Sequence, residues 1–202
     1  MLSADPYVPR HLENTDFDDG SDKWKFSPAE QSRQTGGEQA SMDVKFRDGY
    51  GTVQGRRYNY GIGAVPPDAG TRFLWTKRCE QGPNICTQKI KNLEPGRVYS
   101  LKAVTADYGD MVALNHEPKV LSVRIAIDGV ELLPEESFQE VMTNRSGRAT
   151  EFCMNFHRII FRATSNTARL VISDWISDEE PGGPIGQEIT YNYLQLMPFL
   201  ED

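Results

Sequence analysis

The chain has 202 residues and a formal net charge of −7, with 38% hydrophobic and 10% aromatic residues. This apolar content can fill a core, which excludes global disorder, and the absence of any run of 18 apolar residues excludes a membrane-spanning helix. An acidic protein does not attract nucleic acid through its overall field, so unspecific nucleic-acid binding is excluded as well.

Residues 1–10, which contain Pro6 and Pro9, are predicted to form a loose arm, and residues 11–202 a single β-sandwich domain. The arm lacks the basic start and the apolar stretch of a signal peptide. We therefore expect an intracellular chain, a chain numbered from a point after a removed signal, or a domain cut from a longer protein.

The first predicted loop is acidic, with Asp16, Asp18 and Asp19 followed by Gly20. Calcium prefers several carboxylate and carbonyl oxygens, so the loop is a candidate calcium site, with a solvated turn as the alternative. An EF-hand is excluded, because its loop has glycine at position 6 and glutamate at position 12. Counted from Asp16, Gly20 stands at position 5 and Ser27 at position 12.

After this loop, most of the chain shows the period-two alternation and the β-branched and aromatic residues of strands. Strands are predicted at MDVKFRD (42–48), RRYNYG (56–61), TRFLWTKR (71–78), ICTQKIKNL (85–93), RVYSLKAVTA (97–106), VLSVRIAI (120–127), VELL (130–133), TEFCMNFHRIIFRA (150–163), ARLVISDW (168–175) and EITYNYLQLMP (188–198). Asp128-Gly129, between two of these strands, predicts a tight hairpin. No long helical stripe is present, so nine or ten antiparallel strands predict an all-β sandwich of the jelly-roll type.

The charge is distributed unevenly along these strands. Residues 45–102 contain eleven Lys/Arg and four Asp/Glu, a net charge of +7, which leaves −14 for the remainder. The two parts either neutralise each other across the fold or leave a basic surface for an anionic partner.

Three cysteines, Cys79, Cys86 and Cys153, make an odd number without the spacing of a zinc site. Cys79 and Cys86 bracket a loop with Gly82-Pro83-Asn84 at its tip, and a hairpin there would bring the two sulfurs within bridging distance. Buried thiols are the alternative for all three.

Four fragments, in order, resemble carbohydrate-binding modules of the galactose-binding-like jelly-roll type. LENTDFDDGSDKW (12–24) is similar to their opening and TQKIKNLEPGRVYSLKAVTA (87–106) to their central strand, Pro-Gly turn and strand. VRIAIDGVEL (123–132) resembles their late hairpin and NYLQLMP (192–198) their final strand. The resemblance implies a galactose-binding-like sandwich, with Phe17 and Trp24 filling its mouth.

The resemblance also implies one structural calcium ion shared by the first loop and the last strand. The positions that match are Asp16, Asp18 and Asn192. Asn192 departs from the family, which usually has an acidic residue there, and an amide oxygen ligates without a charge. Such an ion would close the loop and perform no chemistry.

Sugar recognition uses flat aromatic rings against pyranose faces and planar polar groups against hydroxyls. Between Tyr50 and Arg78, Tyr58 and Tyr60 share one face of a predicted strand, and Arg57 and Asn59 the other. Arginine pairs with carboxylate or sulfate, so these tyrosines, Arg57 and Asn59 together suit the binding of a glycan, including an acidic one.

Three further aromatic residues are candidate ligand-binding residues. Trp75 lies in the same basic segment, Tyr108 in the polar loop 107–117, and Trp175 directly after a predicted strand. The alternatives are that Trp75 belongs to the core and that Trp175 caps it rather than forming a binding platform.

The predicted function is a non-catalytic module that binds a polysaccharide or glycan by stacking and hydrogen bonding. The resemblance implies an accessory domain of a secreted carbohydrate-active protein, with further domains beside it and an extracellular or cell-surface location. No nucleic acid and no membrane insertion are expected. A structural or protein-interaction sandwich is the first alternative. A polysaccharide lyase, assembled from Tyr108, His116 and Arg148, is the second.

Overall fold

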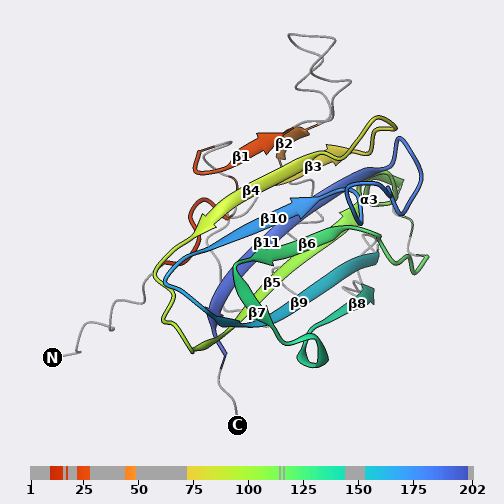
Figure 1. Cartoon of the computed structure of the whole chain (residues 1–202). Coiled ribbons are helices and arrows are strands. Elements are labelled where there is room, and N and C mark those ends of the chain that lie inside the picture. Colours follow the sequence, from red (N-terminus) through yellow and green to blue (C-terminus); the bar gives the residue numbers. More distant parts are fainter. Residues whose placement is uncertain are drawn as a thin grey trace, which may run out of the picture.

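The structure, a computed structural model, describes residues 10–15, 17, 22–27, 44–48, 72–113, 115, 117–143 and 153–199. These residues form two antiparallel sheets stacked face to face (Figure 1). Sheet A has the strand order β1 (Lys25–Ser27), β4 (Ile85–Ile90), β10 (Ala168–Ser173) and β6 (Arg124–Asp128). Sheet B has the order β2 (Val44–Asp48), β3 (Arg72–Lys77), β11 (Glu188–Pro198), β5 (Val98–Asp107), β9 (Cys153–Ala163) and β7 (Val130–Leu132), and β8 (Phe138–Thr143) also pairs with β9.

The predicted all-β sandwich is confirmed, with eleven strands among the described residues rather than nine or ten. Nine of them overlap predicted strands, whereas β1 and β8 were not predicted, and the strand predicted at 56–61 lies outside the described residues. The prediction of one domain over residues 11–202 stays a prediction.

Two short helical segments interrupt the strands. The segment after β5, predicted as a loop, begins with α3 (Tyr108–Ala113), and a 3-10 turn, η2 (Pro134–Glu136), precedes β8. Within the described part of the chain, no helix is long and apolar enough to cross a membrane.

The main core lies between the sheets and includes the predicted mouth residues Phe17 and Trp24. Their ring centroids are 5.2 Å apart, and Trp24 Nε1 donates to the Asn14 carbonyl at 2.9 Å. Within the same core, Tyr99 on β5 stacks on Phe161 on β9, with ring centroids 5.7 Å apart. The first loop therefore closes one end of the core, as the resemblance implied.

A second apolar cluster lies on the other face of sheet B. Leu74 and Ala103 belong to the main core, whereas their chain neighbours Phe73, Trp75 and Val104 belong to the second cluster. Consecutive residues of a strand point to opposite faces, so this cluster lies on the side of sheet B away from sheet A.

The predicted hairpin at Asp128-Gly129 is wrong. β6, before the turn, pairs with β10 in sheet A, whereas β7, after it, pairs with β9 in sheet B. A two-residue hairpin of the predicted type needs positive φ at both central residues, and here Gly129 alone has it, at +79°. The dipeptide therefore carries the chain from one sheet to the other.

Candidate functional site

The predicted ligand residues on strand 56–61, namely Arg57, Tyr58, Asn59 and Tyr60, lie outside the described residues. Their role in binding a sugar stays a prediction. The same holds for His116 and Arg148, which the lyase alternative requires.

The two predicted tryptophans are buried. Trp75 is 3% exposed within the second apolar cluster, and Trp175, two residues after the end of β10, is 7% exposed. Sugar stacking needs an accessible ring face, so this conformation favours the alternatives that the sequence left open, with Trp75 as a packing residue and Trp175 as a cap.

Tyr108 is half-buried at the start of α3 rather than exposed on a loop. Its ring lies 6.0 Å from the ring of Phe73, and it packs against the second apolar cluster. The adjoining Asp107 carboxylate accepts hydrogen bonds from Lys119 Nζ at 3.1 Å and Gln187 Nε2 at 2.9 Å. These contacts anchor the segment, which places Tyr108 at the edge of the cluster.

Of the predicted calcium ligands, Asp16 and Asp18 lie outside the described residues. Asn192 is buried at a bulge in β11, where its Oδ1 accepts a hydrogen bond from Tyr193 N at 2.6 Å. Among the residues that the structure does describe, no group of three or more His, Cys, Asp or Glu is arranged to hold a metal ion. The structural calcium therefore remains a prediction.

Chelation tests that prediction directly. If calcium closes the first loop, excess EDTA lowers the melting temperature and added calcium restores it, because an ion bound to the folded state stabilises it by mass action. Differential scanning calorimetry with magnesium as the control ion measures the shift. A melting temperature that EDTA leaves unchanged contradicts the calcium site.

Cys79, Cys86 and Cys153, all within the described residues, are buried, and none of them forms a disulfide. Burial raises the pKa of the Cys86 thiol well above its usual value. The thiol of Cys86 therefore stays protonated and is a packing residue rather than a nucleophile.

An aromatic and polar surface, which we call the Phe138 platform, lies on the outward face of sheet B. One cross-strand row runs from Phe138 on β8 through Arg158 on β9 and Lys102 on β5 to Gln195 on β11. Ile159, the chain neighbour of Arg158, packs against the main core, so the row points away from it. Phe138 is 44% exposed.

Arg158 is held on this platform by aromatic rings. Its guanidinium carbon lies 5.9 Å from the centroid of Phe138 and 4.9 Å from that of Phe199. Phe156 extends the aromatic surface, with its ring 5.9 Å from that of Phe138. Arg158 Nε is buried and makes no hydrogen bond with a described residue. The platform thus presents ring faces beside an arginine fixed by cation–π contacts.

The Phe138 platform was missed because no single segment of the sequence contains it. Alternation along residues 153–163 does put Phe156 and Arg158 on one face of a strand. Alternation does not predict which strands lie beside this one, however, and Phe138 and Gln195 belong to other strands, β8 and β11.

A second surface feature, which we call the basic cavity, lies on the outward face of sheet A at the end of β4. Its volume is about 610 Å³. Residues from the first loop, β1, β4, β10 and the turn after β6 line it: Glu13, Lys23, Lys25, Thr87, Gln88, Lys89, Lys91, Asp128, Gly129, Thr167, Ala168 and Arg169. The volume falls in the range of small-ligand sites.

No protein-family model and no curated protein sequence matches this chain. Among solved structures, it is similar to the enzymatically active domain of bacteriophage CBA120 tailspike protein 4, with 12% identity and a TM-score of 0.49. That match covers 94% of this chain and 21% of the other, so this chain spans about a fifth of the length of that domain's chain.

The chain is also similar to TmCBM61, whose structure contains β-1,4-galactotriose, with 12% identity and a TM-score of 0.46 over 95% of this chain and 100% of that one. At these values neither similarity carries over a function. The functional argument therefore rests on the side chains of this chain.

Proposed function

We propose that the chain is a non-catalytic carbohydrate-binding module whose glycan lies on the Phe138 platform. The observation that supports this most directly is the ring of Phe138, 44% exposed, beside Arg158, whose guanidinium carbon lies 5.9 Å from the centroid of Phe138 and 4.9 Å from that of Phe199.

The chemistry of the platform suits a pyranose ring. The exposed face of Phe138 offers an apolar surface to the C–H groups of the sugar, while Arg158 and Gln195 offer planar hydrogen-bonding groups to its hydroxyls. These residues stand on strands of one sheet, so the site is preorganised and loses little entropy on binding.

The wider setting follows the sequence resemblance. In this proposal the module serves a secreted carbohydrate-active protein as an accessory domain, outside the cell or at its surface. It concentrates that protein on a polysaccharide without reacting with it. A calcium ion at the first loop would contribute stability and take no part in recognition.

Substitution on the platform tests this function. A glycan array, with neutral and acidic polysaccharides, first identifies a ligand, and calorimetry then measures its affinity for the variants. Phe138→Ala and Arg158→Gln are each expected to weaken binding about tenfold, since a stacking contact or a charged hydrogen bond is worth roughly 1.5 kcal/mol. Val120→Ala, at a residue 68% exposed, is the matched control.

Three outcomes contradict the proposal in different ways. A folded sample that binds no glycan supports the structural or protein-interaction alternative. Binding that Phe138→Ala and Arg158→Gln leave unchanged places the ligand elsewhere. Release of unsaturated product from an anionic polysaccharide supports the lyase alternative.

A further inference from the structure

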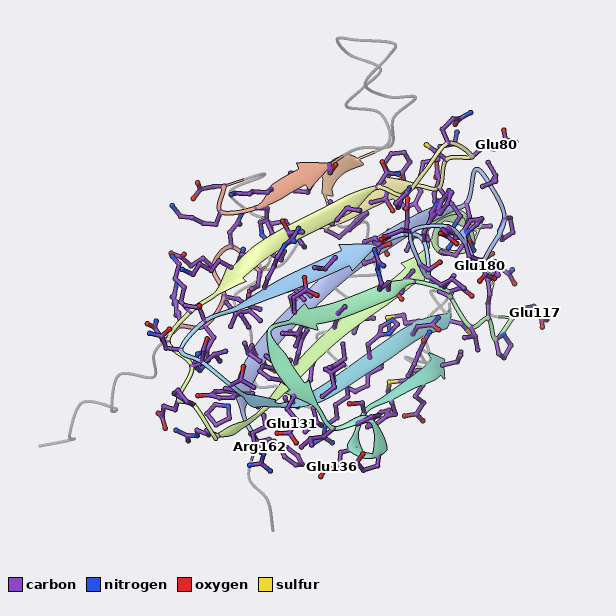
Figure 2. The ribbon with its side chains drawn as sticks, in the orientation of Figure 1. Glu80, Glu117, Glu131, Glu136, Arg162 and Glu180 are labelled. Atoms are coloured by element: carbon purple, nitrogen blue, oxygen red, sulfur yellow. The ribbon has the colours of Figure 1, made fainter. Side chains whose placement is uncertain are left out.

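The basic cavity has a positive charge that the rest of the protein does not share. Its lining contains five basic and two acidic residues, within a chain whose formal net charge is −7. Glu80, Glu117 and Glu180 lie at the other end of the sandwich from the end of β4 (Figure 2). The cavity is therefore a local positive site on an acidic molecule.

Two of these cations have no counter-charge of their own. Lys91 pairs with Glu13 at 2.8 Å, and Arg169 lies 3.9 Å from Asp128. Lys25 and Lys89, both exposed, make no ion pair with any residue that the structure describes. The positive charge that remains is thus concentrated on the strands β1 and β4.

The strand register places these cations on one face. Lys89 stands directly opposite Arg169 in the β4–β10 pair, and Lys25 opposite Thr87 in the β1–β4 pair. Like charges directly opposite each other in a sheet are unfavourable. An anion between Lys89 and Arg169 would relieve that repulsion.

The wall beside the cations is fixed by the first loop. The Gln88 side chain accepts from Glu13 N and donates to Glu13 O, each at 2.8 Å. This clamp holds Glu13, and with it the Glu13–Lys91 pair, against β4. The cavity is therefore formed by strands and by a loop segment anchored to them.

We propose that the basic cavity binds a sulfate or carboxylate group of an anionic polysaccharide. Lysine and arginine supply the charge, and Thr87 and Thr167 at the lining supply hydroxyls for neighbouring sugar oxygens. Among the described residues the lining contains no aromatic side chain on which a nucleobase could stack, and the acidic remainder of the protein repels a long nucleic acid.

This inference rests on the proposed function for the carbohydrate nature of the ligand, but it uses a different sheet and different residues. The Phe138 platform lies on the outward face of sheet B, and the basic cavity on the outward face of sheet A. Variants of the two surfaces therefore separate the two proposals.

Dextran sulfate and unsulfated dextran of equal chain length provide a matched pair of probes, with carboxymethyl dextran for the carboxylate. Affinity electrophoresis or calorimetry on the full chain compares the wild type with the double variant Lys25→Gln/Lys89→Gln. Lys77→Gln, an exposed lysine on β3 away from the cavity, is the control for lost charge. Thermal melts establish that all variants are folded.

The wild type is expected to bind dextran sulfate more tightly than dextran, and the double variant about five- to tenfold more weakly than the wild type at low salt. The difference should shrink between about 10 mM and 150 mM salt, as the Debye length falls. Lys77→Gln should bind like the wild type.

Equal affinity of the wild type and the double variant for dextran sulfate overturns the inference, as does the absence of binding to both anionic dextrans. Single-stranded DNA that binds as tightly as dextran sulfate overturns the assignment to a polysaccharide. If a neutral glycan binds the Phe138 platform while these probes fail at the cavity, the proposed function stands and this inference alone fails.

Discussion

Replacement of Arg78 by methionine is expected to lower the free energy of unfolding by about 3–5 kcal/mol, the cost of breaking a buried charged network. Arg78 is 1% exposed and lies directly after β3. Its Nε donates to the Asp174 carbonyl at 2.8 Å, its Nη2 to the Ser122 carbonyl at 2.6 Å, and its Nη1 to Gln187 Oε1.

Gln187 precedes β11, which pairs with β3 in sheet B, whereas Ser122 and Asp174 flank β6 and β10, which pair in sheet A. Arg78 therefore joins the two sheets, which no strand pairing connects. Methionine has a similar length but no donor, which leaves buried carbonyl oxygens unsatisfied. Asp174 loses a nearby positive charge as well, while its own carboxylate still accepts from Asn84 N at 2.8 Å. Gly183 packs against the guanidinium, since a Cβ there would clash with Nη1.

Urea unfolding at neutral pH measures the effect. Arg97→Met is the matched control, because Arg97 is 42% exposed and makes a surface ion pair with Glu94 at 2.9 Å. Exposed pairs contribute about 0–1 kcal/mol, so the control should unfold close to the wild type. Equal losses for the two variants would show that Arg78 is no more important than a surface arginine.

His157 is expected to make the protein less stable in mild acid. The side chain is buried in β9, where its Nε2 lies 2.8 Å from Thr105 Oγ1, and burial lowers the pKa of His157 from 6.5 to about 4. The unfolded chain therefore binds a proton near pH 6.5, whereas the folded protein binds it only near pH 4. The contribution of neutral, buried His157 to the free energy of unfolding is therefore complete above pH 6.5 and is lost progressively down to pH 4. The loss amounts to about 3 kcal/mol in total.

His157→Gln removes this titration while keeping a polar group of similar size. Urea midpoints from pH 7 to pH 4 should fall more steeply for the wild type than for the variant. The carboxylates titrate in both proteins, so the difference between the two curves isolates His157. Parallel curves would contradict the shift of the His157 pKa.

The alternation of residues predicted the strands well because burial on one face imposes a period of two. β11 was predicted with its observed bounds, Glu188–Pro198. The turn at Pro95-Gly96 was also predicted correctly, with Gly96 at a φ of +87°. What alternation cannot give is the partner of each strand. The Asp128-Gly129 dipeptide fits a hairpin locally, and only the pairing of β6 with β10 excludes it.

The same limit applies to the candidate site. Trp75 and Phe138 are both aromatic residues in strands, yet Trp75 is 3% and Phe138 44% exposed. Composition cannot distinguish them, because the exposure of a residue on the outer face of a sheet depends on what covers that face. The basic residues were easier to find, since Lys89 and Lys91 lie within the segment whose charge is +7.

The place of β11 has a consequence for how the protein is made. This strand is late in the chain, yet it lies in the middle of sheet B between β3 and β5 (Figure 1). Until β11 has been synthesised, the edges of β3 and β5 that pair with it in the folded protein have no partner strand. Such edges are prone to pair with other chains, and contacts of high sequence separation form slowly. Folding should thus be completed only after synthesis has passed residue 198, which makes the newly made chain dependent on protection from aggregation.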